Sequence, residues 1–320
     1  MKYLRNLKYY LCKKSTYFRR LINSVWPVIE FKYDFSNISG FKYRLILILT
    51  LLNLGIRTMI GRILGKFEII SMEFVITTKC TLKCKDCANL LQHYEKPYNL
   101  HIEKLIRYFD KLTKVFDYIH NLTILGGEPL MHPEFSTLLE YVCNSSKVGT
   151  VKVVTNGTLI PKEKTLSALN SPKVLVKVSN YGPLSNKIEE LADVFTEHNI
   201  NYRIMQLDRW FDYGNIEVRN RSSQELSEIF SSCRTPICQS YLNGEFHFCP
   251  RSSAGIDLGV VERRASDYVD IGNLDAKEAR RQVKIFLNKT KYVQACDYCN
   301  NASCLPLIEI EPGTQAAHYM

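Results

Sequence analysis

The sequence predicts an α/β protein, an open and partial barrel of five to six strand–helix units with a basic N-terminal extension and a small cysteine-rich C-terminal domain. Three observations predict this architecture. Apolar strand-like runs alternate with helix-like segments between residues 71 and 205. The 11 cysteines fall mainly into two short-spaced groups, and the net charge of +10 belongs to the first 70 residues. We expect three parts, at residues 1–70, 71–225 and 226–320.

The N-terminal extension differs from the rest of the chain in charge. Residues 1–70 hold 13 Lys and Arg against 3 Asp and Glu, whereas the remaining 250 residues hold 29 of each. Residues 45–56 are mostly apolar, but these 12 residues are fewer than the about 20 that span a bilayer. One interpretation is an anchor on an anionic membrane surface, and the other is a helix packed against the protein or a partner subunit. Because the charge is confined to this segment and no recognition motif accompanies it, no nucleic-acid partner is expected.

The predicted strands and helices alternate in order. Short apolar runs predict the strands, and apolar residues at helical spacing, with Pro133 in a first turn and Ser185 as a cap, predict the helices. Strand, helix and strand in succession imply parallel strands joined by right-handed crossovers. The strands are expected at residues 73–77, 122–125, 150–154, 174–178 and 202–205, and the helices at 102–116, 134–143 and 186–197.

The alternation stops after residue 205. Only 27 residues separate the fifth predicted strand from Cys233, which leaves little room for a further helix and a sixth strand. In residues 241–249 an Asn-Gly pair between apolar residues predicts a hairpin. With one predicted helix at 276–288 and six cysteines, this part is expected to be a separate small domain.

The first cysteine group is a C-x3-C-x2-C motif in the loop after the first predicted strand, formed by Cys80, Cys84 and Cys87. Clustered cysteines in a chain without a secretory signal indicate a reducing, cytoplasmic compartment and metal binding rather than disulfides. A 4Fe-4S cluster wants four ligands, so three thiolates leave one iron open to a ligand that is not protein. A zinc site that also uses His93 is the alternative.

Glycine and polar residues follow the next three predicted strands. They include Gly126-Gly127-Glu128 after the second strand, Asn156 after the third and Ser179 after the fourth. In a parallel barrel these loops lie on one rim, where active sites are built. Paired glycines let a ligand approach the backbone, Glu128 can bind an ammonium group, and amide and hydroxyl groups can hydrogen-bond a ribose or a carboxylate.

With these motifs, about residues 71–205 resemble the radical S-adenosylmethionine (radical SAM) superfamily. The resemblance implies that Cys80, Cys84 and Cys87 bind a 4Fe-4S cluster and that S-adenosylmethionine chelates its open iron. It also implies reductive cleavage of S-adenosylmethionine to a 5′-deoxyadenosyl radical, which abstracts hydrogen from a C–H bond of the substrate. Asp86 stands where the family typically carries an aromatic residue next to the third cysteine.

The same resemblance implies a cosubstrate site on the other loops. Gly126, Gly127 and Glu128 would hold the amino group of S-adenosylmethionine, and Asn156 and Ser179 would contact other parts of it.

The second cysteine group resembles the auxiliary-cluster domains called SPASM and Twitch. In those domains a hairpin cysteine and a later C-x2-C pair enclose a second 4Fe-4S cluster. At least one auxiliary cluster is therefore expected; two clusters and a structural zinc are the alternatives. The candidate ligands are Cys249, Cys296, Cys299 and one of Cys233 or Cys238, with Cys304 as the remaining member of the group.

The resemblance implies an oxidoreductase-type enzyme that oxidises or epimerises a C–H position. A sugar-type substrate, a saccharide or a lipid-linked glycan, is expected, because peptide-maturing relatives often carry a folded leader-binding domain and residues 1–70 show no clear strand pattern. The alternatives are a peptide-modifying maturase and, in another class, a non-catalytic iron–sulfur or zinc protein. A reductant such as a flavodoxin or ferredoxin is the expected protein partner. The expected location is the cytoplasm, peripheral to the membrane if the extension binds lipid.

Overall fold

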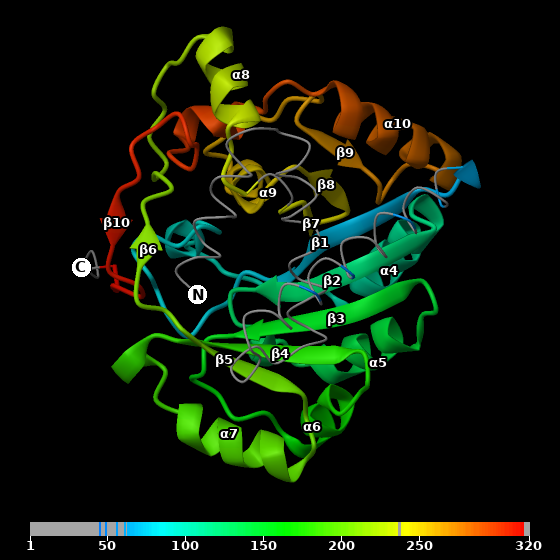
Figure 1. Cartoon of the computed structure of the whole chain (residues 1–320), viewed down its shortest axis with the longest axis vertical. Helices are drawn as coiled ribbons and strands as arrows, with labels where there is room; N and C mark the ends of the chain where they lie inside the picture. Colours follow the sequence, from blue (N-terminus) through cyan, green and yellow to red (C-terminus); the bar gives the residue numbers. More distant parts are fainter. Residues whose placement is uncertain are drawn as a thin grey trace.

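The computed structural model describes residues 63–235 and 238–316, together with residues 45, 49, 56 and 61. Eight strands form one largely parallel sheet, and two short strands pair separately (Figure 1). The α/β class and the partial barrel that the sequence predicts are confirmed.

The elements follow one another as the sequence predicts, with additions. The described strands are β1 (Glu68–Thr77), β2 (Tyr118–Gly126), β3 (Val148–Thr155), β4 (Val174–Asn180), β5 (Tyr202–Gln206), β6 (Trp210–Phe211), β7 (Ser240–Leu242), β8 (Glu245–His247), β9 (Tyr268–Asp270) and β10 (Glu309–Ile310). The described helices are α4 (Ile102–Val115), α5 (Phe135–Asn144), α6 (Glu163–Leu169), α7 (Ile188–Glu197), α8 (Ser223–Ser231), α9 (Pro250–Asp257) and α10 (Ala276–Lys289).

Five parallel strands form one half of the sheet, in the order β5-β4-β3-β2-β1. Neighbouring strands place apolar residues in register: Met72 pairs with Leu122, and Leu122 pairs with Val151. All three side chains are fully buried, in the same core as Leu105 of α4 and Leu139 of α5. Burial of this apolar face against the crossover helices is the main force that holds the parallel half together.

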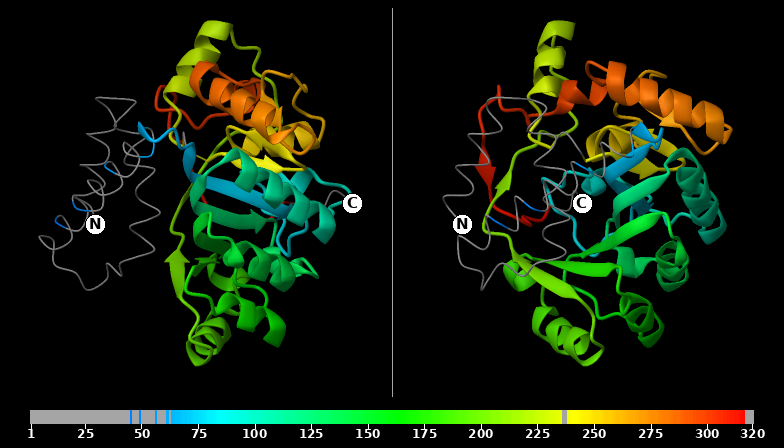
Figure 2. Two further views of the ribbon diagram at one scale, coloured as in Figure 1. Left: turned by 90° about the vertical axis from the view of Figure 1, so that its right-hand side faces the viewer. Right: turned by 45° about the vertical axis from the view of Figure 1, so that its right-hand side comes forward.

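The C-terminal part continues the same sheet. β7 pairs in parallel with β1, with Glu73 opposite Ser240, and β8 and β9 follow as antiparallel strands. The predicted hairpin is confirmed, and Asn243 and Gly244 both have positive φ at its turn, as a two-residue hairpin requires. Figures 1 and 2 show α8 and α10 at the β9 end of the molecule and α7 at the opposite end. The predicted boundary at residue 226 stays a prediction, and the sheet is continuous across it.

One expectation about local structure is wrong, and another is met only in part. The stretch before Cys233 does hold a further helix, the nine-residue α8, but the two-residue strand β6 pairs with β10 outside the eight-stranded sheet and adds no sixth strand beside β5. Ser222 and Glu225 form a capping box at the start of α8. Ser185 does not cap α7, whose cap position is Lys187, because the Ser185 hydroxyl is bound to other loops.

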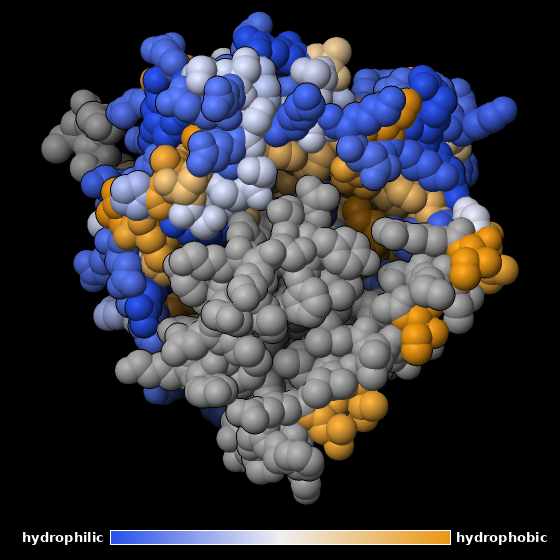
Figure 3. Space-filling view, turned by 45° about the horizontal axis from the view of Figure 1, so that its top comes forward, coloured by the Kyte–Doolittle hydropathy of each residue, from blue (hydrophilic) through white to orange (hydrophobic). Residues whose placement is uncertain are grey.

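Most of the N-terminal extension, and with it the prediction of a membrane anchor, lies outside the described residues. Within it, Leu45, Leu49 and Ile56 are helical, and each side chain is about half exposed, at 47%, 56% and 57%. Figure 3 shows separate hydrophobic groups on a face of the molecule that also carries many hydrophilic residues. In the described part of the chain no helix has the length and apolar character needed to cross a membrane.

Candidate functional site

The loops that the sequence singles out gather at one edge of the parallel half. β1 to β4 are neighbours and run in the same direction, so their carboxyl ends meet there. The β1 loop lies directly on the β2 loop: Gly127 N donates to Thr77 O at 3.0 Å, and Glu128 N donates to Lys79 O at 2.8 Å.

The first cysteine group lies in the loop after β1, and its three side chains are half-buried. Burial, with smaller contributions from the neighbouring thiols, raises the pKa of Cys80 to about 12 and that of Cys84 to about 11. Burial also raises the pKa of Cys87. The three thiols therefore lie near enough to act on one another.

The zinc alternative for the first cysteine group needs His93 as its fourth ligand. His93, the fourth ligand of the zinc alternative, instead shares a hydrogen bond of 2.6 Å with Asn215 Oδ1. An iron–sulfur cluster, which takes each thiolate on a different iron, fits these residues better.

The two glycines after β2 are required by the closeness of the cysteine loop. A Cβ added to Gly126 would lie 2.1 Å from Thr77 O, and one added to Gly127 would lie 2.0 Å from Lys79 O. The predicted role of these glycines in binding S-adenosylmethionine stays a prediction. The structure shows that the cysteine loop itself makes the close approach to the backbone.

Glu128 joins the β2 loop to the β3 loop. Its side chain is fully buried. Oε2 accepts hydrogen bonds from Asn156 N at 2.8 Å and from the Thr155 hydroxyl at 3.0 Å, and Oε1 accepts one from Leu130 N at 3.1 Å. Burial raises its pKa to about 7, against the opposing effect of these donors. The predicted contact with an ammonium group stays a prediction, and it would add to this bracing role.

Asn156 joins the β3 loop to the cysteine loop. Its side chain is 8% exposed, and its amide nitrogen donates to Thr81 Oγ1 at 2.9 Å and to Cys80 Sγ at 3.6 Å. The side-chain oxygen Oδ1 of Asn156 accepts a hydrogen bond from Thr158 N at 3.1 Å. Asn156 therefore holds the first cysteine in place. Its predicted contact with S-adenosylmethionine is untested.

Ser179 is the last but one residue of β4 rather than a loop residue. Its backbone oxygen accepts a hydrogen bond from Ser185 Oγ at 3.0 Å, and the same hydroxyl donates to Asn156 O at 2.6 Å. Ser185 thus links the ends of β3 and β4.

Tyr181 is a site residue that the sequence prediction did not assign. Burial raises the pKa of its phenol, and the three thiols Cys84, Cys87 and Cys80 raise it further, so the ring lies beside the first cysteine group. Its ring packs edge-on against Trp210, with 5.4 Å between the centroids. The available signal was the position of Tyr181 directly after the fourth strand.

A C-terminal segment also reaches the first cysteine group. Lys85 N donates to Thr314 O at 2.8 Å, and Ala316 N donates to Lys83 O at 2.7 Å. The Gln315 side chain accepts from Lys83 N at 2.7 Å and donates to Cys84 Sγ at 3.5 Å. We call residues 309–316 the C-terminal strap. It is anchored by the pairing of β10 with β6, and no local sequence motif marks it.

Five cysteines of the second group lie near enough to interact. Burial raises the pKa of Cys296 and of Cys238; Cys249, Cys299 and Cys233 raise that of Cys296 further, and Glu73, Cys233 and Cys249 raise that of Cys238. Burial raises the pKa of Cys249 to about 12. Cys304 is exposed and accepts a hydrogen bond from Ser232 Oγ at 3.0 Å. The structure therefore brings together the five predicted candidate ligands and leaves Cys304 outside the group.

Comparison with known proteins defines the class of the central part. The profile of the Radical SAM superfamily matches residues 74–182. This part of the chain is a radical SAM domain, the class of enzyme domain that uses a 4Fe-4S cluster and S-adenosylmethionine. The half-buried three-cysteine loop, with Gly126 and Gly127 packed beneath it, fits such a cluster.

Among individual proteins, the chain is similar to the antilisterial bacteriocin subtilosin biosynthesis protein AlbA of Bacillus subtilis (strain 168). The two are 36% identical over 108 residues, which cover 33% of this chain and 23% of AlbA. The chain thus spans about a quarter of this curated relative.

Solved structures with similar folds show low identity. They include Streptococcus suis SuiB bound to the precursor peptide SuiA, at 20% identity and a TM-score of 0.35 over 54% of this chain and 40% of SuiB. Native anSMEcpe with bound AdoMet and Cp18Cys peptide is 17% identical, with a TM-score of 0.46 over 73% of this chain and 89% of that one. BtrN in complex with AdoMet and 2-DOIA is 17% identical, with a TM-score of 0.42 over 76% and 96%.

Proposed function

We propose that this protein is a radical SAM enzyme that modifies a peptide. The observation that carries the proposal is the similarity to AlbA over 108 residues, since AlbA serves the biosynthesis of a bacteriocin, and a bacteriocin is a peptide product. This favours the peptide alternative over the sugar-type substrate that the sequence prediction preferred. The radical SAM domain also disfavours a non-catalytic iron–sulfur or zinc protein, because the loops after β2 and β3 would then have no reaction to serve.

In this proposal Cys80, Cys84 and Cys87 hold the 4Fe-4S cluster. When bound, the cluster and S-adenosylmethionine supply the one-electron chemistry that generates the hydrogen-abstracting radical. The chain's own task is to fix the loops and exclude water. Glu128 and Asn156 provide the fixed geometry, because each joins two loops through hydrogen bonds that are sheltered from solvent.

An auxiliary cluster is the second part of the proposal. Its ligands would be Cys249, Cys296, Cys299 and Cys233. Cys238 is the alternative to Cys233 as the fourth ligand, because both interact with Cys249. An auxiliary cluster within reach of the site would serve a net oxidation, with a flavodoxin or ferredoxin as the reductant of the first cluster.

The test is anaerobic reconstitution followed by iron counting and reduction with dithionite in the presence of S-adenosylmethionine. We expect about eight irons per chain and the release of 5′-deoxyadenosine, with Cys80→Ala losing about four irons and all of the 5′-deoxyadenosine. Precursor peptides encoded beside the gene should raise the yield, whereas a matched set of monosaccharides should not. Loaded protein that releases no 5′-deoxyadenosine would refute the enzyme assignment, and a response to sugars alone would restore the first expectation.

Contact with a membrane surface is a separate proposal for the N-terminal extension. It is supported by the charge of residues 1–70 and by the exposed side chains of Leu45, Leu49 and Ile56. Sedimentation with vesicles that contain anionic lipid tests it. The full chain should bind and a chain without residues 1–60 should not, and equal binding of the two would refute the proposal.

A further inference from the structure

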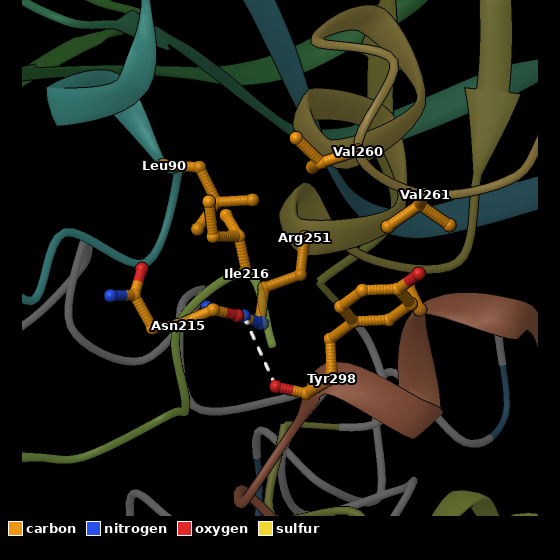
Figure 4. Close-up of a pocket in the computed structure, with 8 residues that line it drawn as sticks. Leu90, Asn215, Ile216, Arg251, Val260, Val261 and Tyr298 are labelled. Carbon is orange, nitrogen blue, oxygen red and sulfur yellow. Dashed lines mark hydrogen bonds between the residues drawn. The ribbon is translucent and has the colours of Figure 1, made fainter. Parts of the chain in front are cut away.

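A narrow pocket is lined by residues that neighbour both cysteine groups in the sequence. Its lining combines Leu90, three residues after Cys87, with Arg251, two residues after Cys249, and Tyr298, which precedes Cys299 (Figure 4). The remaining lining is mostly apolar, from Ile216, Val260, Val261 and Ala295, together with Asn215. The pocket therefore joins segments that carry both proposed cluster sites.

Arg251 is the charged residue of this pocket, and its hydrogen bonding is incomplete. The side chain is 5% exposed. Nη2 donates to Asn215 O at 2.6 Å and to Tyr298 O at 3.3 Å, the second of which is drawn in Figure 4. Nε and Nη1 are buried and have no hydrogen-bond partner in the described part of the chain. A buried guanidinium with two unmet donors is costly, so acceptors for them are expected.

The position of Arg251 in its helix adds to this cost. Arg251 is the second residue of α9, which follows Cys249. A cation in the first turn opposes the helix dipole, which favours negative charge there. In the described residues no Asp or Glu forms an ion pair with it. The positive charge of Arg251 is thus unfavourable at this position of the protein alone. This points to a partner that a bound cofactor supplies.

The segments around Arg251 point to sulfur as that partner. Cys249 lies two residues before Arg251, and Tyr298, whose backbone oxygen accepts from Nη2, directly precedes Cys299. Leu90, which lines the same pocket, donates its N–H to Cys87 O at 3.0 Å. Arg251 therefore lies next to segments that carry both cysteine groups. Within the guanidinium, Nε–H and Nη1–H point to opposite sides of the Cζ–Nε axis, so these two donors suit two separate acceptors rather than one bidentate carboxylate.

We propose that Arg251 is a positioning residue that donates its free N–H groups to the sulfur atoms of the auxiliary iron–sulfur group and, on the other side, of the group at Cys87. This inference rests on the auxiliary cluster of the proposed function. Hydrogen bonds and positive charge at cluster sulfurs stabilise the reduced, more negative state, and so raise the reduction potential. Arg251 thereby sets the auxiliary group to receive an electron readily.

The test is a set of variants followed by EPR-monitored redox titration of the reconstituted protein. Arg251→Met removes the charge and the donors at similar volume, and Arg251→Lys keeps the charge. We expect Arg251→Met to lower the equilibrium constant for reduction of the auxiliary cluster about tenfold. For one electron this lowers the reduction potential by about 59 mV. Arg251→Lys should retain most of the wild-type potential. Arg280→Met is the matched control, since Arg280 donates to Asp117 and to Val115 O, away from both cysteine groups.

Each outcome decides the matter. Potentials that are unchanged in Arg251→Met at full iron content refute the inference, and so does a rise in KM without a shift in potential, which would make Arg251 a substrate-binding residue. If Arg251→Met does not load iron, the comparison of Arg251→Lys with Arg251→Gln replaces it, and equal potentials of these two at full loading refute the inference. About four irons in the wild type would instead refute the auxiliary cluster on which this inference rests, and would leave the radical SAM assignment standing.

Discussion

Glu128 offers the sharpest test of how the loops around the candidate site are held together. The change is Glu128→Gln, which keeps the shape of the side chain and replaces one oxygen by an NH2 group. Three donors point at the carboxylate: Asn156 N, the Thr155 hydroxyl and Leu130 N. No orientation of a glutamine can accept from all three, because its nitrogen accepts nothing.

The cost follows from counting these bonds. Oε1 has one partner and Oε2 has two, so the glutamine nitrogen is least unfavourable on the Leu130 side. There one buried N–H loses its acceptor, and a lost partner of this kind costs about 1–3 kcal/mol. One kcal/mol corresponds to about 2–4 °C in chains of 150–250 residues, and to less in a longer chain. The melting temperature should therefore fall by a few degrees.

The assay is thermal unfolding under anaerobic conditions, combined with titration of S-adenosylmethionine. Glu134→Gln is the matched control, since Glu134 is exposed and its side chain caps nothing. Glu128→Ala, which leaves all three donors without an acceptor, should be less stable than Glu128→Gln. If Glu128→Gln has the same melting temperature as the wild type, the bracing role of Glu128 is refuted. A loss of S-adenosylmethionine binding at unchanged stability would support the amino-group role alone.

Three further predictions concern the same region. Gly127→Ala should prevent the cysteine loop from lying on the β2 loop and so lower the iron content. Gly61→Ala is the control and should keep its iron, because its Cβ would meet only the end of the Glu68 side chain. Equal iron in both variants would contradict the packing argument. Gln315→Leu should speed hydrogen exchange at Lys83 N by removing its acceptor, with Gln282→Leu, which loses only a bond to Glu278, as the control; unchanged exchange would show that the strap does not depend on this side chain. Burial raises the pKa of Glu73 from 4.5 to about 8, so the folded state keeps a proton that the unfolded state releases, and the free energy of unfolding should fall as pH rises from about 5 to 8. In urea unfolding this fall should be smaller in Glu73→Gln, and identical pH profiles would refute the assignment.

Much of the parallel half could be predicted from the sequence because its signals are local. Apolar runs located β1 to β5, although β1 begins at Glu68 rather than Glu73, since residues 68–71 still pair with β2. The cysteine spacing and the polar residues after each strand located the site. α6, α8 and α9 were not predicted, because helices of seven to nine residues carry too few apolar positions to establish a period.

At the glycines the structure shows a reason for the residue type that the sequence alone did not give. A Gly-Gly pair indicates that something approaches the backbone closely, and the sequence alone does not say what. At Gly126 and Gly127 the approaching groups are Thr77 O and Lys79 O of the same chain. A ligand contact remains compatible with this packing.

The connections between distant segments could not be predicted, for a physical reason. Gln315 and Cys84 are 231 residues apart, and the backbone ladder that brings them together uses N–H and C=O groups that every non-proline residue has. Such pairing imposes no residue type, so it leaves no pattern to detect. Arg251 is the opposite case: its residue type is specific, but its significance depends on two N–H groups that lack acceptors after folding. Only the folded chain shows that Arg251, two residues after Cys249, lines a pocket together with Leu90, three residues after Cys87. The motifs therefore identify the two cysteine groups separately, whereas their coupling is a property of the fold, and the potentials of the Arg251 variants measure that coupling directly.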